Sequence, residues 1–142
     1  KWDESVVFIW FKHEVPRKIN PFQSVMISDV EKVKKSGLAV RPGIYIRTIE
    51  AKGKSMVGEV GFILNKEYPY NLSDIDSNMY IEQLEPSLYA TMECNVYDPF
   101  ICFNFMRLVQ RFGFKAKGIK LEKFESPNES TFSYMIPLLM PH

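Results

Sequence analysis

The chain has 142 residues, of which 46% are hydrophobic, 25% charged and 14% aromatic. These proportions fit one folded domain over residues 1–142 and exclude a disordered or low-complexity chain. Eighteen Lys and Arg residues against 17 Asp and Glu residues leave a net charge of +1. The strong positive field that attracts DNA or anionic lipid is therefore missing, and by itself the chain is a poor candidate for binding either.

The first half of the chain predicts a strand, a helix and two further strands. An apolar run over 6–11 predicts the first strand. Asn20, Pro21 and Phe22 read as the N-cap, the first helical residue and the first apolar contact of a helix that ends at Gly37. Alternating apolar residues then predict strands over 43–50 and 55–64.

The second half repeats this order. A strand over 88–94 precedes a helix that begins after Asp98 and ends at Gly113, and strands over 118–125 and 131–138 follow. The segment that starts at Gly43 aligns without a gap with the segment that starts at Gly118.

These patterns predict an α+β fold made of two pseudo-symmetric strand-helix-strand-strand repeats. The repeats cover about 5–64 and about 79–142, and a polar, proline-bearing linker covers about 65–78. Because neither half alone has enough buried surface to be stable, we expect antiparallel curved sheets that enclose a ligand cavity, with the two main helices outside.

Nothing in the sequence calls for a metal, a cofactor or a membrane. Cys94 and Cys102 are the only cysteines and lack metal-binding spacing, which predicts a reducing, cytoplasmic compartment. A calcium-loop pattern runs from Asp74 to Glu85, but Met79 stands where the loop requires glycine, so we interpret it as a negatively charged linker. The residues from Tyr80 onward alternate like a strand. The longest apolar run is too short to span a bilayer.

Three short motifs, together with the duplicated plan, resemble the gyrase-inhibitor-like effector-binding domain. They are Leu84-Glu85-Pro86-Ser87-Leu88-Tyr89-Ala90, Gly118-Ile119-Lys120-Leu121-Glu122 and Met135-Ile136-Pro137-Leu138. Such domains often form the C-terminal sensor of MerR-type or AraC-type bacterial transcription regulators, and some stand alone. The resemblance therefore implies a small organic ligand, and contact with DNA only through a domain outside this chain.

The resemblance also bears on the intact protein. Because the chain starts at Lys1 without an initiator Met, we expect it to be a fragment of a longer regulator. Whether that regulator forms a homodimer stays open.

The resemblance assigns a ligand-binding role to Glu122. In multidrug-responsive members of the family, a glutamate at the base of an aromatic cavity neutralises lipophilic cations, and the motif places that role on Glu122. Strand alternation puts Lys120, Glu122 and Phe124 on one face. The alternative is that Glu122 is an ordinary solvated charge on a strand.

Arg47 aligns with Glu122 in the repeat, so we expect it to enter the same cavity. There it would select a zwitterionic, anionic or hydrogen-bonding ligand, or would simply close the pocket. The candidate aromatic walls come from predicted strands, with the core as the alternative location for each. They are Trp10, Tyr45, Tyr89, Phe124, Phe132 and Tyr134.

A second interpretation keeps the fold but changes the function. Some stand-alone relatives are hydrolases that use a cavity glutamate as general base beside an aromatic residue. Glu122 with Tyr89 or Trp10 would serve if burial raised the carboxyl pKa. The two histidines, His13 and His142, have no credible nucleophile near them, which speaks against catalysis of the Ser-His type.

Overall fold

The computed structural model describes residues 5–65, 79–98 and 100–139. The strands are β1 (Val6–Pro16), β2 (Ile44–Lys52), β3 (Ser55–Ile63), β4 (Met79–Leu84), β5 (Leu88–Asn95), β6 (Leu121–Phe124) and β7 (Thr131–Leu138), and the helices are α1 (Gln23–Ser36) and α2 (Phe100–Arg111). Apart from Asn65, the predicted linker lies outside the described residues.

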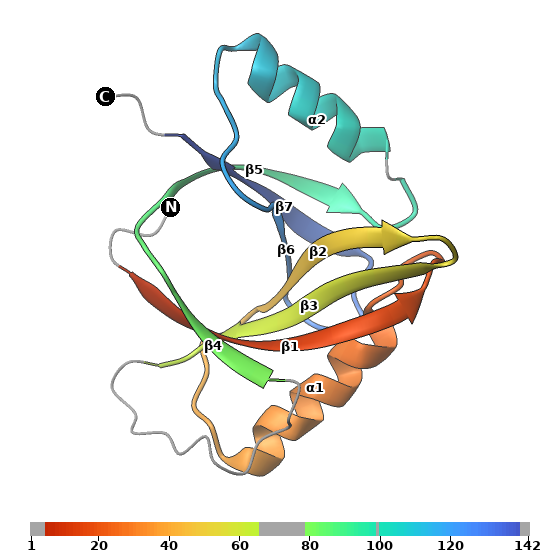
Figure 1. Cartoon of the computed structure of the whole chain (residues 1–142), viewed down its shortest axis with the longest axis vertical. Helices are drawn as coiled ribbons and strands as arrows, with labels where there is room; N and C mark the ends of the chain where they lie inside the picture. The colour runs from red at the N-terminus through yellow and green to blue at the C-terminus, as the bar shows by residue number, and fades with distance from the viewer. Residues whose placement is uncertain (1–4, 66–78, 99, 140–142) are drawn as a thin grey trace.

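The seven strands form one open, curved antiparallel sheet in the order β4-β1-β3-β2-β6-β7-β5 (Figure 1). This confirms the α+β class. The two halves of the chain meet at the centre of the sheet, where β2 pairs with β6 and Ile46 lies opposite Glu122. β4 pairs with β1, so it extends the part of the sheet that the first half of the chain builds.

The sheet must curl because its two edge strands are neighbours in the sequence. Only residues 85–87 separate β4 from β5, so the Cα atoms of Leu84 and Leu88 lie within about 14 Å of each other. Seven flat strands would span about 29 Å. The two edges therefore approach each other at the end where this short link crosses.

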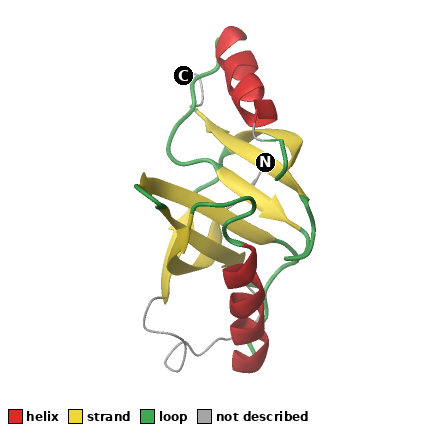
Figure 2. Ribbon diagram, turned by 90° about the vertical axis from the view of Figure 1, so that its right-hand side faces the viewer, coloured by secondary structure: helices red, strands yellow, loops and turns green. Residues whose placement is uncertain are grey.

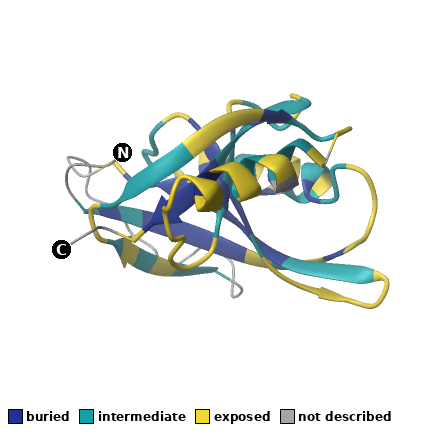
Figure 3. Cartoon of the chain, turned by 90° about the horizontal axis from the view of Figure 1, so that it is seen from above, coloured by how far each residue is buried: buried dark blue, intermediate teal, exposed yellow. Residues whose placement is uncertain are grey.

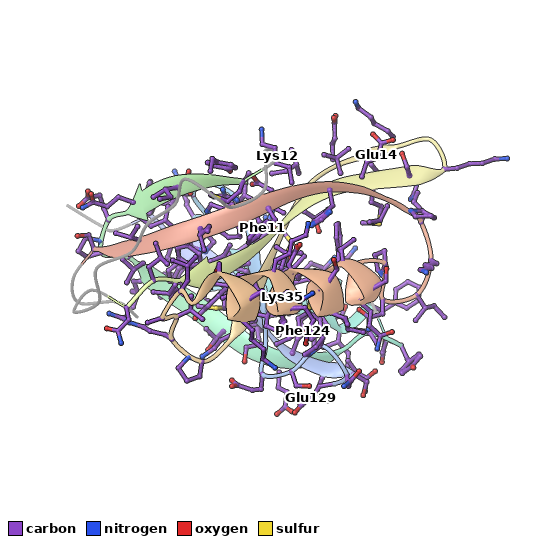
Figure 4. The ribbon with its side chains drawn as sticks, turned by 90° about the horizontal axis from the view of Figure 1, so that it is seen from below. Phe11, Lys12, Glu14, Lys35, Phe124 and Glu129 are labelled. Carbon is purple, nitrogen blue, oxygen red and sulfur yellow. The ribbon has the colours of Figure 1, made fainter. Side chains whose placement is uncertain are left out.

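Both helices cover one face of the sheet (Figure 2), which we call the helix face. Its core packs α1 residues such as Met26 and Val33 against β-strand residues such as Phe11 and Ile46. The opposite, open face has its own buried cluster, which contains Phe8, Trp10, Tyr45, Ile63, Leu121 and Met135. Figure 4 shows Lys12 and Glu14 on the side of β1 that points away from α1, as strand alternation requires.

The start of α1 differs from the prediction. The helix begins at Gln23 with Phe22 at the N-cap, so Asn20 is not the capping residue. Asn20 instead adopts a left-handed conformation with φ of 51°, and its carbonyl accepts a hydrogen bond of 3.3 Å from the Gln23 amide. Asparagine tolerates this region better than most residues, so a turn forms ahead of the helix. The end of α1 at a left-handed Gly37 is confirmed.

The second half of the chain is less buried than the first. Along α2, Val109 is buried but Phe100 is 71% exposed, and Figure 3 shows most of this helix as exposed surface. β6 is shorter than predicted because residues 118–120 leave the sheet, where Ile119 is 44% exposed. None of the helices in the described part of the chain is both long and apolar enough to cross a membrane.

Candidate functional site

A cavity of about 660 Å³ opens on the helix face, and we call it the helix-side pocket. Its floor comes from β2, β6 and β7. Its rim comes from the loop before α1, the loop before α2 and the first turn of α2. It is lined by Lys18, Ile19, Asn20, Pro21, Phe22, Ile46, Thr48, Met56, Asn95, Val96, Tyr97, Cys102, Glu122, Phe124, Phe132 and Tyr134. Most of these side chains are apolar or aromatic, as in pockets that bind organic ligands.

Glu122 lies on the floor of this pocket, between Ile46 of β2 and Tyr134 of β7 in the strand register. Among the described residues, no hydrogen bond or ion pair reaches its carboxyl group. The side chain is partly open to the pocket, yet protein surrounds it closely enough for burial to raise its pKa from 4.5 to about 7. Near neutral pH the carboxyl group is therefore a mixture of protonated and ionised forms.

The other polar groups of the pocket floor are uncharged at neutral pH. The Tyr134 hydroxyl donates to the Met106 sulfur at 3.8 Å. Burial, and after it the neighbouring Cys102 and Glu122, raise the Tyr134 pKa to about 12. Cys102 and Cys94 lie with their sulfur atoms 3.3 Å apart, and burial raises the Cys102 pKa to about 12, so this thiol stays protonated. Glu122 is thus the only carboxyl group in the described lining of this pocket.

The structure divides the eight predicted site residues between two faces. Glu122, Phe124, Phe132 and Tyr134 lie together in the helix-side pocket. The other four lie on the open face, where they do not share a cavity with Glu122. They are Trp10, Tyr45, Arg47 and Tyr89, of which Trp10, Tyr45 and Tyr89 belong to or pack against the open-face cluster.

The expectation that Arg47 enters the cavity of Glu122 is wrong. Ile46, not Arg47, lies opposite Glu122 in the β2–β6 pair. Residues that lie directly opposite in a sheet share a face, and a register shift of one residue moves every side chain to the other face. Arg47 and Glu122, which the gap-free alignment equates, therefore lie on opposite faces of the sheet.

Arg47 is held instead by a network on the open face. Its Nε donates to Glu59 Oε1 at 3.0 Å, its Nη1 to Glu82 Oε1 at 2.9 Å and its Nη2 to the Tyr80 hydroxyl at 2.9 Å. The guanidinium group lies 4.1 Å from the centre of the Trp10 ring, whose Nε1 also donates to Glu82 at 3.3 Å. Trp10 lies flat over Gly61, where a Cβ atom would meet the ring at 2.3 Å.

Several residues of the helix-side pocket and of the Arg47 network were not predicted from the sequence. Asn20 and Tyr97 line the helix-side pocket from loops, where apolar periodicity carries no information. Glu59, Tyr80 and Glu82 were not assigned to a site, although alternation along β3 and β4 puts their side chains on the face of Trp10 and Arg47. A correct register between the strands would have found them.

Comparisons with known proteins support the fold. No protein-family model matches the chain, and no curated protein matches it. Among solved structures, the chain is similar to EcmrR in an EcmrR–DNA complex solved by cryo-EM, with a TM-score of 0.73 and 14% identity over 97% of this chain and 55% of that one. It is also similar to the EcmrR C-terminal domain, with a TM-score of 0.70 and 13% identity over 97% of this chain and 94% of that one.

The chain therefore has the fold of a MerR-type effector-binding domain, as the resemblance implied. It spans about half of the EcmrR chain in the DNA complex. At this level of identity the similarity establishes the fold, and the function has to be argued from the site.

Proposed function

We propose that this chain is the small-molecule-binding domain of a transcription regulator, with the helix-side pocket as its effector site. The observation that carries the proposal is a pocket of about 660 Å³ that is mostly apolar and contains one carboxyl group, Glu122, without a protein partner among the described residues. Contact with DNA belongs, in this proposal, to a domain outside this chain.

The lining suggests the chemistry of the effector. Phe124, Phe132 and Tyr134 offer ring surfaces, and Glu122 offers a single polar anchor at the floor. An aromatic or largely apolar molecule fits such a surface, because the pocket supplies dispersion contacts and few hydrogen bonds. If the effector carries a positive charge, ionised Glu122 pairs with it in a poorly hydrated site, where the attraction is strong.

The charge of the effector can be found from the pH dependence of binding. A cationic effector binds the ionised carboxylate, so its affinity should rise as pH increases through about 7. A neutral effector that accepts a hydrogen bond from the protonated carboxyl should lose affinity over the same range. An effector that does not touch Glu122 should show neither trend.

A thermal-shift screen with lipophilic cations, neutral aromatic compounds and organic anions tests the proposal. A compound at about 100 times its Kd should stabilise the domain by about 2.7 kcal/mol. For a cation this gain should be lost in Glu122→Gln, and for every compound it should be kept in Glu125→Gln, which carries the same substitution on an exposed residue. A panel that never stabilises the protein, or hits that bind Glu122→Gln equally well, would refute Glu122 as the anchor.

The hydrolase interpretation requires Tyr89 or Trp10 beside Glu122. Tyr89 and Trp10 lie on the open face, so neither can assist Glu122. The aromatic residue beside Glu122 in the sheet is Tyr134, whose hydroxyl bonds to Met106 and is fully protonated at neutral pH. We therefore favour binding over hydrolysis.

A further inference from the structure

A further cavity, of about 280 Å³, opens beside Glu122, and we call it the polar branch. Its walls are more polar than those of the helix-side pocket, and they consist of Thr48, Ile49, Gly118, Ile119, Lys120, Glu122 and Tyr134. Thr48, Glu122 and Tyr134 also line the helix-side pocket, so the two cavities meet at these residues. A ligand whose apolar part fills the helix-side pocket can therefore extend past Glu122 into the polar branch.

The polar branch opens where the pairing of β2 with β6 stops. On β6 this pairing ends at Glu122. The same antiparallel register would place Thr48 opposite Lys120, but residues 118–120 have left the sheet. The other side of β2 is irregular at the same level, because its pairing with β3 shifts register between Thr48 and Glu50. Such bulges bend a strand and are frequent beside functional sites. Thr48 and Lys120 therefore flank an opening instead of a hydrogen-bonded ladder.

Two side chains of opposite charge line the polar branch without neutralising each other. Lys120 is partly buried and comes just ahead of β6, on which Glu122 lies. Among the described residues, neither Lys120 nor Glu122 has a hydrogen-bond or ion-pair partner, so they do not pair with each other. Each charge is therefore available to a ligand, and each repels a ligand group of its own sign.

We propose that the effector is a zwitterion with an aromatic body, whose ammonium group pairs with ionised Glu122 and whose carboxylate group binds Lys120 in the polar branch. This inference rests on the helix-side pocket being the effector site. The aromatic body lies against the ring surface of that pocket. Thr48 supplies a hydroxyl group that can donate to the carboxylate. A compound with a single charge meets repulsion, from Lys120 if it is a cation and from Glu122 if it is an anion.

Three compounds with the same phenyl group separate the two charges. Phenylalanine carries both charged groups, 2-phenylethylamine lacks the carboxylate, and 3-phenylpropanoate lacks the ammonium group. We would titrate each compound into the protein at pH 8, above the Glu122 pKa of about 7, and follow the backbone amides of Thr48 and Glu122 by NMR. We expect phenylalanine to shift both amides and to bind at least about tenfold more tightly than either analogue.

Lys120→Met tests the contact with the carboxylate. The residue lies outside the strands and is only partly buried, so the variant should fold. Phenylalanine should bind this variant about tenfold more weakly or worse. In contrast, 2-phenylethylamine should bind it at least as tightly as the wild type, because a repelling charge has been removed. Lys115→Met carries the same substitution on an exposed residue that lines neither cavity, and it should keep the preference for phenylalanine.

The proposal is overturned if either analogue binds the wild type as tightly as phenylalanine, if Lys120→Met keeps the preference for phenylalanine, or if no compound of the three shifts the two amides. Equal binding of phenylalanine and 2-phenylethylamine that is lost in Glu122→Gln would refute the contact with Lys120 and leave the helix-side pocket as the effector site. The effector site itself fails only if the wider thermal-shift panel also stabilises nothing.

Discussion

A carboxyl group that is buried without a partner makes stability depend on pH, and Glu122 is such a group. Its pKa is about 7 in the folded chain and 4.5 in a solvated glutamate. Below pH 4.5 both states are protonated, and burial of the neutral group costs little. As pH rises from 4.5 through 7, the unfolded state releases its proton first, so the folded state loses stability relative to it.

We therefore expect Glu122→Gln to be more stable than the wild type at pH 8 and nearly equal to it at pH 4. The shift of the Glu122 pKa to about 7 sets an upper limit of about 3 kcal/mol for the difference. Urea unfolding at a series of pH values measures it. The free energy of unfolding of Glu125→Gln should follow that of the wild type at every pH. A pH-independent difference between wild type and Glu122→Gln would contradict this account of the carboxyl group.

Individual residues of the site differ in whether the sequence could predict their position. Alternation within one strand correctly grouped Glu122 with Phe124, because neighbouring residues of a strand always point to opposite faces. Alternation says nothing about how strands are offset from one another. Arg47 was therefore paired with Glu122 by alignment, whereas the sheet places Ile46 there.

Among the elements, α1 is attached to the sheet by a largely buried side-chain hydrogen bond as well as by apolar packing. Asp29 in α1 is fully buried, and its Oδ2 lies 2.6 Å from His13 Nε2 of β1. Lys32 is 3.6 Å from Asp29 Oδ1, one turn along the helix. Such a contact stabilises little by itself, but loss of one partner leaves a charge without compensation in the core.

This predicts a non-additive response to substitution. His13→Leu should destabilise the chain by about 2 kcal/mol or more, because Asp29 stays buried with Lys32 as its one remaining ionic partner among the described residues. The double variant His13→Leu, Asp29→Leu should recover part of that loss, since it removes the buried charge too. A double-mutant cycle by chemical denaturation measures the coupling, and simple additivity would show that the contact carries no energy.

All six strands and both helices that the sequence predicts are present, although β6 is shorter and α1 starts later than predicted. Periodicity identified most of them, and an uninterrupted apolar run identified β1, which is buried on both faces at Phe8, Ile9, Trp10 and Phe11. β4 was recognised only as an alternating stretch without a partner. Its pairing with β1 crosses more than sixty residues of sequence, and contacts at that distance depend on topology rather than on local pattern.

For the whole molecule, the continuous sheet predicts that both parts unfold together. β2 and β6 join the two parts by backbone hydrogen bonds at the centre of the sheet. Native-state hydrogen exchange should therefore give the most protected amides of β3 and of β7 the same free energy of opening. If the amides of β7 exchanged through an opening of clearly lower energy while β3 stayed protected, the two parts would be separate cooperative units.

The three-residue link between β4 and β5 has a consequence for self-association. An edge strand normally offers its free backbone groups to another chain, and long exposed edges lead to aggregation. Here the two edges converge where the link crosses, so an incoming strand would collide with the opposite edge at that end. A further strand could therefore pair only at the ends where the two edges diverge, near Met79 of β4 and Asn95 of β5.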